Sequence, residues 1–146
     1  SAVHAAYVAA GSEAVTTNTF GANARKLGGK AEVEEVFRAA VGCARRAGAR
    51  YVAADIGPIG ALLRPMGTLS FAEAYGLFAQ QARAAARAGA DLFIIETMTD
   101  LAEIKAAVRR LDLAECRRIA RAALEHRDAE ATRALLRATW PWLGQA

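Results

Sequence analysis

The stretch Gly89-Ala90-Asp91-Leu92-Phe93-Ile94-Ile95-Glu96-Thr97 places a glycine, a four-residue apolar run and two polar residues in succession. A short apolar run without polar alternation is typical of a strand that is covered on both faces of a sheet. The same order occurs twice earlier, where the runs 14–17 and 51–54 follow Gly11 and Gly48 at the same small offset. The repeat predicts three buried strands, each preceded by a helix that ends at a glycine.

Signals for helix starts support this repeat. Ser70 and Glu73 have the spacing of a capping box, in which each side chain bonds the backbone N–H of the other residue. Asp100 and Glu103 have the same spacing, with aspartate as the cap. The first of these helices is expected to run to about residue 88 and to press an apolar stripe against the sheet. The expected stripe residues are Phe71, Tyr75, Phe78 and Ala82.

Strands joined by helices must run parallel, with right-handed connections. The sequence therefore predicts an α/β fold, and the two candidate architectures are an open doubly wound sheet and part of a (β/α)8 barrel. No strand is followed by a G-x-G-x-x-G motif and no G-x-x-x-x-G-K-[ST] motif occurs, which removes the main support for nucleotide binding.

Polar residues stand where each predicted strand ends. Parallel sheets bind their ligands at the carboxyl ends of the strands, so these residues are candidates for a binding site. The candidate site residues are Thr17, Asn18, Thr19, Asp55 and Glu96. Asp55 also opens a tight loop, residues 55–60, whose glycines permit close approach of the backbone.

Composition limits the class of protein. The chain has 146 residues, 54% hydrophobic and 23% charged, which suits one domain with a core and excludes a disordered tail. The formal net charge is +4, but the basic side chains are scattered among acids, so no nucleic-acid partner is predicted. No apolar run approaches the roughly 18 residues of a membrane span, and no signal peptide is expected. Two cysteines without a pairing pattern favour a reducing, cytoplasmic location.

The pattern of strands and helices changes near Leu111. Residues 112–146 are expected to form a helical pair, over 113–125 and 129–140, with no strand between the two helices. Two units are therefore predicted: a partial α/β unit over residues 1–111 and a helical tail over residues 112–146.

Three motifs in this chain resemble one family. They are Val15–Asn23 with the following Arg25-Lys26-Leu27, Asp55–Gly60, and Ala90–Glu103. They resemble the homocysteine-binding barrel of the homocysteine S-methyltransferases, in particular its cobalamin-dependent branch. That family is a (β/α)8 TIM barrel of roughly twice this length. The resemblance implies that residues 1–111 are part of such a barrel, with about three parallel strands and their helical crossovers.

The resemblance also implies a chemistry. In the family, a zinc ion held by three cysteines binds the homocysteine thiolate, which attacks a cobalamin- or folate-derived methyl donor to give methionine. Coordination to the metal removes the proton that an alkyl thiol otherwise keeps at neutral pH. The implied partner is homocysteine. By resemblance, Glu96 would bind the homocysteine ammonium group. Lining the opening of the same binding site, called the mouth below, would be Thr17, Asn18 and Thr19.

Each of these assignments has a simpler alternative. Glu96 could cap the following turn or pair with an arginine. The hydroxyls of Thr17 and Thr19 could make the local hydrogen bonds that end a strand. Asp55 either shapes its loop through backbone hydrogen bonds or faces the substrate. The residues themselves leave these alternatives open.

The chain departs from the family pattern at the metal. The family's zinc cysteines lie in an Asn-Cys motif and a Gly-Gly-Cys-Cys motif, and neither occurs here. Cys43 and Cys116 fall in predicted helices and cannot supply three ligands. His4 and His126 are expected to be surface or packing residues. We therefore expect the isolated chain to bind neither zinc nor a methyl donor and to transfer no methyl group. The alternative is a non-catalytic module that self-associates through open sheet edges or binds an amino acid weakly.

Overall fold

The computed structural model describes residues 1–108 together with residues 134 and 138. Its contacts divide the chain into two units, Ser1–Ala107 and Val108–Ala146, and the fold below is that of the first. The helix expected over 113–125 lies outside the described residues. So does the helix expected over 129–140, apart from residues 134 and 138, which are both helical.

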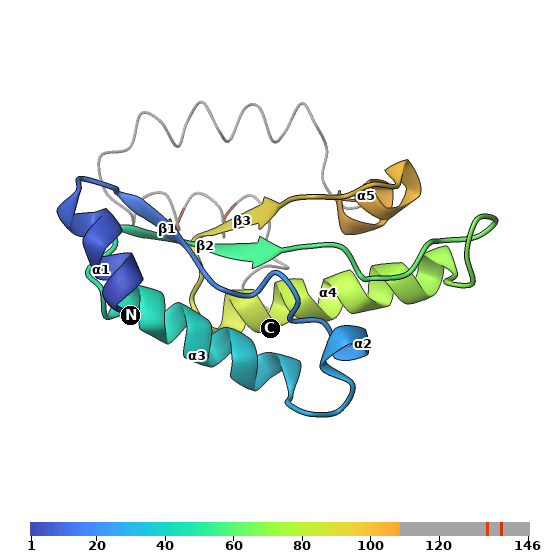
Figure 1. Ribbon diagram of the computed structural model, residues 1–146, viewed down its shortest axis with the longest axis horizontal. Helices are drawn as coiled ribbons and strands as arrows, with labels where there is room; N and C mark the ends of the chain where they lie inside the picture. The colour runs from blue at the N-terminus through green and yellow to red at the C-terminus, as the bar shows by residue number, and fades with distance from the viewer. Residues whose placement is uncertain (109–133, 135–137, 139–146) are drawn as a thin grey trace. The chain divides into compact units, whose positions relative to one another are not determined.

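Three short strands form one parallel sheet in the order β1-β2-β3 (Figure 1). β2 pairs with β1 on one side and with β3 on the other, and both pairings are parallel. The α/β class with helical crossovers is thus confirmed, and the arrangement is consistent with part of a TIM barrel. The strands are β1 (Ala14–Thr16), β2 (Tyr51–Ile56) and β3 (Leu92–Ile95).

The helices follow the predicted starts and stops. Gly11, Gly48 and Gly89 all adopt positive φ angles just beyond a helix, as expected of glycines that end helices. Ser70 and Glu73 form the capping box in both directions. The helices are α1 (Ala2–Ala9), α2 (Ala24–Leu27), α3 (Val33–Arg45), α4 (Phe71–Arg87) and α5 (Leu101–Val108).

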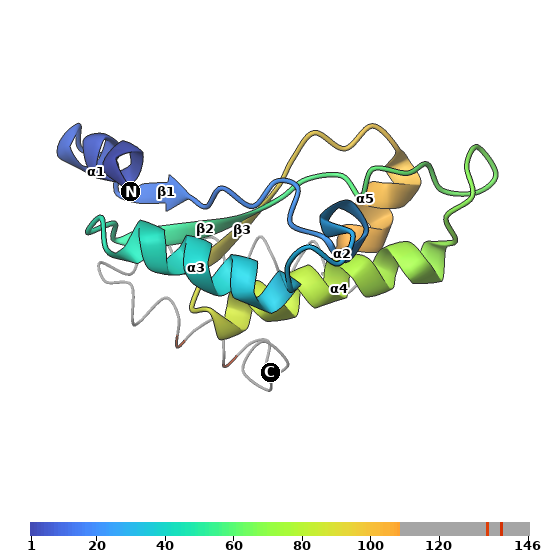
Figure 2. The ribbon, with the colours of Figure 1, turned by 60° about the horizontal axis from the view of Figure 1, so that its bottom comes forward.

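The core lies between one face of the sheet and the helices α3 and α4, which Figure 2 shows on the same side of the strands. Val52 packs with Val41 of α3, and Ala54 packs with both helices. Ile56 extends this core toward Phe78 of α4. Since neighbouring residues of a strand point to opposite faces, residues 53, 55, 92 and 94 belong to the other face of the sheet.

Two sequence predictions about packing were wrong. Only the central strand β2 is buried along most of its length, whereas the side chains of Leu92 and Ile94 in β3 are exposed. The reason is that β3 is an edge strand in the described sheet. The buried face of α4 also differs from the expected stripe. Tyr75 of that stripe is only half-buried, and small alanines instead allow α4 to pack closely on α3 and the sheet. The buried face of α4 consists of Ala74, Phe78, Gln81, Ala84 and Ala85.

Strand ends also differ from the prediction. β1 ends at Thr16 and so excludes Thr17, although the N–H of Thr17 still donates to the carbonyl of Ala53 at 2.9 Å. β2 continues through Asp55 to Ile56, two residues beyond the predicted end. The extension occurs because β2 pairs with β3 at these two residues, which adds hydrogen bonds that the single-strand pattern cannot reveal.

A carboxylate locks the amino ends of β2 and β3. The Asp91 carboxylate accepts the backbone N–H of Val52 at 2.7 Å and forms an ion pair with Arg45 of α3. Arg45 also donates to the carbonyl of Gly89 at 2.7 Å. This cluster joins a helix, a turn and a strand at the amino ends of the strands, opposite the carboxyl ends where parallel sheets bind their ligands.

The free edge of β1 is covered by α1. His4 is half-buried, and its Nε2 lies 3.0 Å from the carbonyl oxygen of Thr16. A carbonyl can only accept, so Nε2 carries the proton in this hydrogen bond. The prediction that His4 is a packing or surface residue fits this contact, while His126 lies outside the described residues. Among the described helices, none combines the length and apolar character needed to cross a bilayer.

Candidate functional site

The carboxyl ends of the three strands bring most of the predicted site residues together. Asp55 lies within β2 and is 9% exposed, and Glu96 follows β3 directly and is exposed. Thr17 and Thr19 follow β1 and are buried. Asn18 lies between them but is exposed and takes no part in their hydrogen bonds. The parallel register explains this convergence, because all three chains leave the sheet at the same edge.

Thr17, Thr19 and Asp55 form a closed ring of hydrogen bonds. The Thr19 hydroxyl donates to the carbonyl of Asp55 at 2.8 Å, and the N–H of Asp55 donates to the Thr17 hydroxyl oxygen at 3.1 Å. The two hydroxyl oxygens lie 2.6 Å apart. Because the Thr19 proton is directed at the carbonyl, the Thr17 hydroxyl must donate to Thr19. We name these three hydrogen bonds the threonine ring.

The carboxyl groups of Asp55 and Glu96 belong to the same face of the sheet. Asp55 pairs with Ile94 in register, and Glu96 is two residues beyond Ile94 on the same strand line. Asp55 Oδ1 is buried and has no hydrogen-bond partner among the described residues. Burial, and secondly the negative charge of Glu96, raise the pKa of the Asp55 carboxyl above its ordinary value. Two acids and an unsatisfied oxygen make this a site suited to a cation.

Glu96 itself keeps its carboxylate available. Among the described residues, no arginine lies within ion-pair distance of it. The next residue, Thr97, has a φ of 59°, a left-handed conformation that a β-branched residue rarely adopts. The backbone therefore turns sharply just after Glu96. Such strain is found at functional sites, where the surrounding structure holds it in place.

Glu103 supports the loop at the rim of the site and does not form the predicted capping box. It was expected to bond back to Asp100 in a capping box, but its Oε1 instead accepts the N–H of Ile59 at 2.7 Å. Asp100 does act as a cap, since its Oδ1 accepts the N–H of Ala102 at 2.8 Å. Glu103 is 3% exposed and fixes the loop that follows β2. Its partner is 44 residues away, so helix spacing could not have identified the contact.

The loops after β1 and β2 pack tightly on each other. A Cβ atom at Gly57 would lie 2.6 Å from the ring of Phe20 and 2.6 Å from its backbone oxygen, so a larger residue cannot occupy position 57. The ammonium group of Lys26 lies 5.2 Å from the centre of the same ring, a cation–π contact. These contacts hold the rim of the site, as predicted for a glycine-rich loop in close approach.

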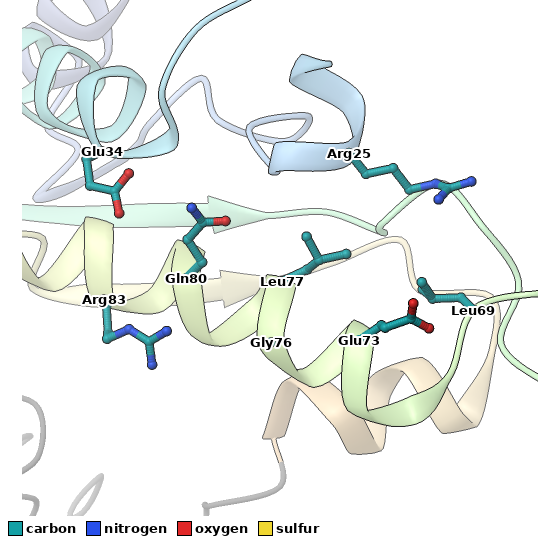
Figure 3. A pocket seen from close by; sticks show the side chains of 8 residues that line it. All are labelled: Arg25, Glu34, Leu69, Glu73, Gly76, Leu77, Gln80 and Arg83. Carbon is teal, nitrogen blue, oxygen red and sulfur yellow. The ribbon is translucent and has the colours of Figure 1, made fainter. Parts of the chain in front are cut away.

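A separate hollow of about 730 Å³ lies among α2, α3 and α4 (Figure 3). Figure 3 shows Arg25 and Glu73 at one end of it and Glu34 and Arg83 toward the other, with Leu77 between. The pKa of Glu73 is lowered, mainly by its hydrogen bonds with Ser70 and to a lesser extent by the charges of Arg64 and Arg25. Neither Asp55 nor Glu96 lines this hollow, so it is distinct from the strand-end site.

The described residues do not fit a zinc site. No cluster of three or more His, Cys, Asp or Glu side chains in that part of the chain could hold a metal ion. Cys43 is half-buried on α3, and its sulfur accepts a hydrogen bond from Arg46 at 3.3 Å. It lies on a helix, not at a strand end, and Cys116 lies outside the described residues. No step through zinc can be assigned to the residues described here.

Comparison with known proteins places the chain in a family. The family model described as "Homocysteine S-methyltransferase" matches residues 1–137, and so extends past the predicted boundary at residue 111. The methionine synthase of Mycobacterium tuberculosis (strain ATCC 25618 / H37Rv) is 32% identical over 117 residues. The methionine synthase of Mycobacterium leprae (strain TN) is 31% identical over 117 residues. Each comparison covers 73% of this chain and 10% of the relative.

The chain therefore spans about a tenth of the length of the curated relatives it matches. The family binds homocysteine and uses zinc and a methyl donor. Each of the three motifs that resemble this family includes the carboxyl end of a strand, where the structure places Thr17, Asp55 and Glu96. This chain belongs to the homocysteine S-methyltransferase family, of whose barrel it contains a part.

Proposed function

We propose that this chain is the part of a homocysteine S-methyltransferase domain that holds the amino-acid end of homocysteine. Glu96 and Asp55 bind the ammonium group at the strand-end mouth, and Asn18 lines the exposed rim of the same mouth. The observation that carries the proposal is the buried Oδ1 of Asp55, which has no hydrogen-bond partner among the described residues and lies on the same face as Glu96. Burial, and secondly repulsion by Glu96, raise the pKa of Asp55. A cation between the two acids would satisfy that oxygen and offset both effects.

The thiol end of homocysteine is activated elsewhere. Zinc and a cobalamin- or folate-derived methyl donor belong to the family, but the described residues supply no metal site. The isolated chain is therefore proposed to bind homocysteine without methylating it. Purified, zinc-supplemented chain incubated with homocysteine and methyl donor should form no methionine. Methionine formation that disappears in Glu96→Ala would contradict this part of the proposal.

The binding step is tested by calorimetry with a pair of ligands that differ only in the amine. Homocysteine and its analogue without the amino group, 4-mercaptobutanoate, share the thiol and the carboxylate. We expect homocysteine to bind with a Kd near the millimolar range, about −4 kcal/mol, because part of the family's site is absent from this chain. We expect no measurable binding of 4-mercaptobutanoate. Equal affinity for both ligands would contradict ammonium recognition.

A second candidate function is self-association through β3. Its side chains Leu92, Phe93 and Ile94 are 41%, 36% and 38% exposed, and no described strand pairs with its outer edge. Unpaired strand edges with apolar side chains are templates for pairing between chains. Under this alternative, sedimentation shows dimers or larger species, and Ile94→Lys restores the monomer. A wild-type chain that sediments as a monomer at all concentrations would contradict it.

A further inference from the structure

The threonine ring supplies the hydrogen bonds that a longer β1 would make to the backbone of Asp55. The N–H of Thr17 makes the last backbone hydrogen bond from β1 to β2, and β1 ends before it reaches Asp55. The N–H and carbonyl of Asp55 point toward β1, on the side of β2 away from β3. Without further β1 backbone to meet them, these two groups bond the hydroxyls of Thr17 and Thr19 instead. Buried backbone polar groups require such partners.

Resting on the proposed function, we propose that Thr17 and Thr19 are positioning residues that hold the Asp55 carboxyl toward the substrate ammonium. They are not ligands of the substrate, although the family resemblance places them in the lining of the mouth. The ring bonds the peptide planes on both sides of the Asp55 α-carbon, which restrains both backbone dihedral angles of that residue. Because these two angles are restrained, the direction of the Cα–Cβ bond of Asp55 is fixed.

The hydroxyl protons support this assignment. Each threonine hydroxyl has one proton, and both protons are committed inside the ring. Thr17 is 2% exposed and Thr19 is 1% exposed, so neither hydroxyl reaches the solvent that a ligand would displace. The exposed acid Glu96 is not hydrogen-bonded to the ring. Loss of the ring should therefore weaken the contribution of Asp55 to binding and leave that of Glu96 intact.

The test uses isosteric and conservative substitutions in the full chain. Thr17→Val and Thr19→Val remove a hydroxyl while keeping the shape of the side chain, and Thr17→Ser and Thr19→Ser keep the hydroxyl. Thr16→Val is the matched control, because Thr16 is exposed at the end of β1, directly before Thr17, and its side chain is outside the ring. The first measurement is hydrogen exchange at the Asp55 amide in the ligand-free chain. The second is the Kd for homocysteine and for 4-mercaptobutanoate.

We expect Thr17→Val, which removes the acceptor of the Asp55 N–H, to exchange that amide about three- to tenfold faster, the effect of losing one hydrogen bond at the amide. Thr19→Val keeps that acceptor and removes the two hydrogen bonds of the Thr19 hydroxyl, so its effect on the amide should be smaller. We also expect homocysteine binding to weaken about five- to tenfold, which is the affinity that one charge-assisted hydrogen bond contributes. The serine variants and Thr16→Val should match the wild type in both measurements. Unchanged amide exchange in Thr17→Val, or failure of Thr17→Ser to keep the wild-type rate, would overturn the inference.

The two measurements separate this inference from the proposed function. If the wild type does not prefer homocysteine over 4-mercaptobutanoate, the proposed function fails, and the substrate part of the inference fails with it. The amide measurement then still decides whether the ring restrains Asp55. If the valine variants do not fold, hydrogen exchange of the two threonine hydroxyl protons is measured in the wild-type chain. Slow exchange of both protons supports the ring, and rapid exchange overturns it.

Discussion

The carboxylate of Glu103 accepts the backbone N–H of Ile59 at 2.7 Å, so that a buried acid of α5 holds the loop that follows β2. This hydrogen bond connects α5 to the rim of the strand-end site. A buried N–H that loses its acceptor costs about 1–3 kcal/mol. We expect Glu103→Ala to lower the free energy of unfolding by about this amount in urea titrations. Glu103→Gln retains an acceptor oxygen and should cost less; equal losses in the two variants would contradict the proposed hydrogen bond.

The raised pKa of Asp55 gives a pH dependence with a definite sign. The folded chain binds the Asp55 proton more tightly than the unfolded chain, whose pKa is near the ordinary 3.8. This acid therefore lowers stability progressively as the pH rises from about 3.8 through the folded pKa. We expect Asp55→Asn to be more stable than the wild type at pH 7, with a difference that shrinks as the pH falls toward 3.8.

Thermal unfolding from pH 3.5 to pH 7, chosen to span the titration of a carboxyl group, measures that difference. Glu96→Gln provides a second check, because removing its charge should bring the pKa of Asp55 closer to the ordinary value in a carbon-13 titration. A wild-type chain whose stability relative to Asp55→Asn rises from pH 4 to pH 7 would show that the sign is wrong.

The ion pair and hydrogen bond of Asp91 at the amino ends of β2 and β3 are expected to contribute to stability and not to homocysteine binding. Asp91→Ala removes the partner of Arg45 and the acceptor for the N–H of Val52. The Arg45 side chain is 30% exposed and keeps its hydrogen bond to Gly89, so the main cost is the buried N–H of Val52 that loses its acceptor, about 1–3 kcal/mol. A lower urea midpoint is therefore expected. Homocysteine affinity, measured on the fraction that remains folded, should not change. A loss of affinity without a loss of stability would contradict the assignment.

Relief of the backbone strain in the turn after Glu96 is expected to raise stability, unlike the substitution of Asp91. Thr97 pays the steric cost of a left-handed conformation, about 1–2 kcal/mol, and glycine does not. Glycine loses more chain entropy on folding, so the net gain expected for Thr97→Gly is about 0.5–1 kcal/mol. Chemical denaturation measures this gain. Destabilisation by Thr97→Gly would indicate that the threonine side chain makes contacts that outweigh the strain.

Much of the fold follows from local signals in the sequence. Gly11, Gly48 and Gly89 identified the ends of three helices, because the left-handed conformation is an intrinsic property of glycine. The end of β2 was placed two residues early, since pairing with β3 sets it and no property of β2 itself reveals the partner. The exposure of Leu92 and Ile94 was likewise missed, because an apolar run has the same sequence at an edge as in the centre.

The site was predictable to a similar depth. The polar residues at the strand ends could be found, since parallel strands end at a common edge. The hydrogen bonds among Thr17, Thr19 and Asp55 could not, because they depend on the register between β1 and β2. Glu103 was visible as an acid at a helix start, but the same spacing serves a capping box and a contact to a distant loop.

The claim that two strand-end acids hold the ammonium group of homocysteine is tested most directly by calorimetry on Glu96→Gln. The control is Glu34→Gln, which removes an exposed acid of α3 from the separate hollow. We expect Glu96→Gln to weaken homocysteine binding at least about tenfold, as expected for a lost charge-assisted contact. Glu34→Gln should keep the wild-type affinity. Unchanged affinity in Glu96→Gln, or an equal loss in both variants, would show that Glu96 does not bind the ammonium group.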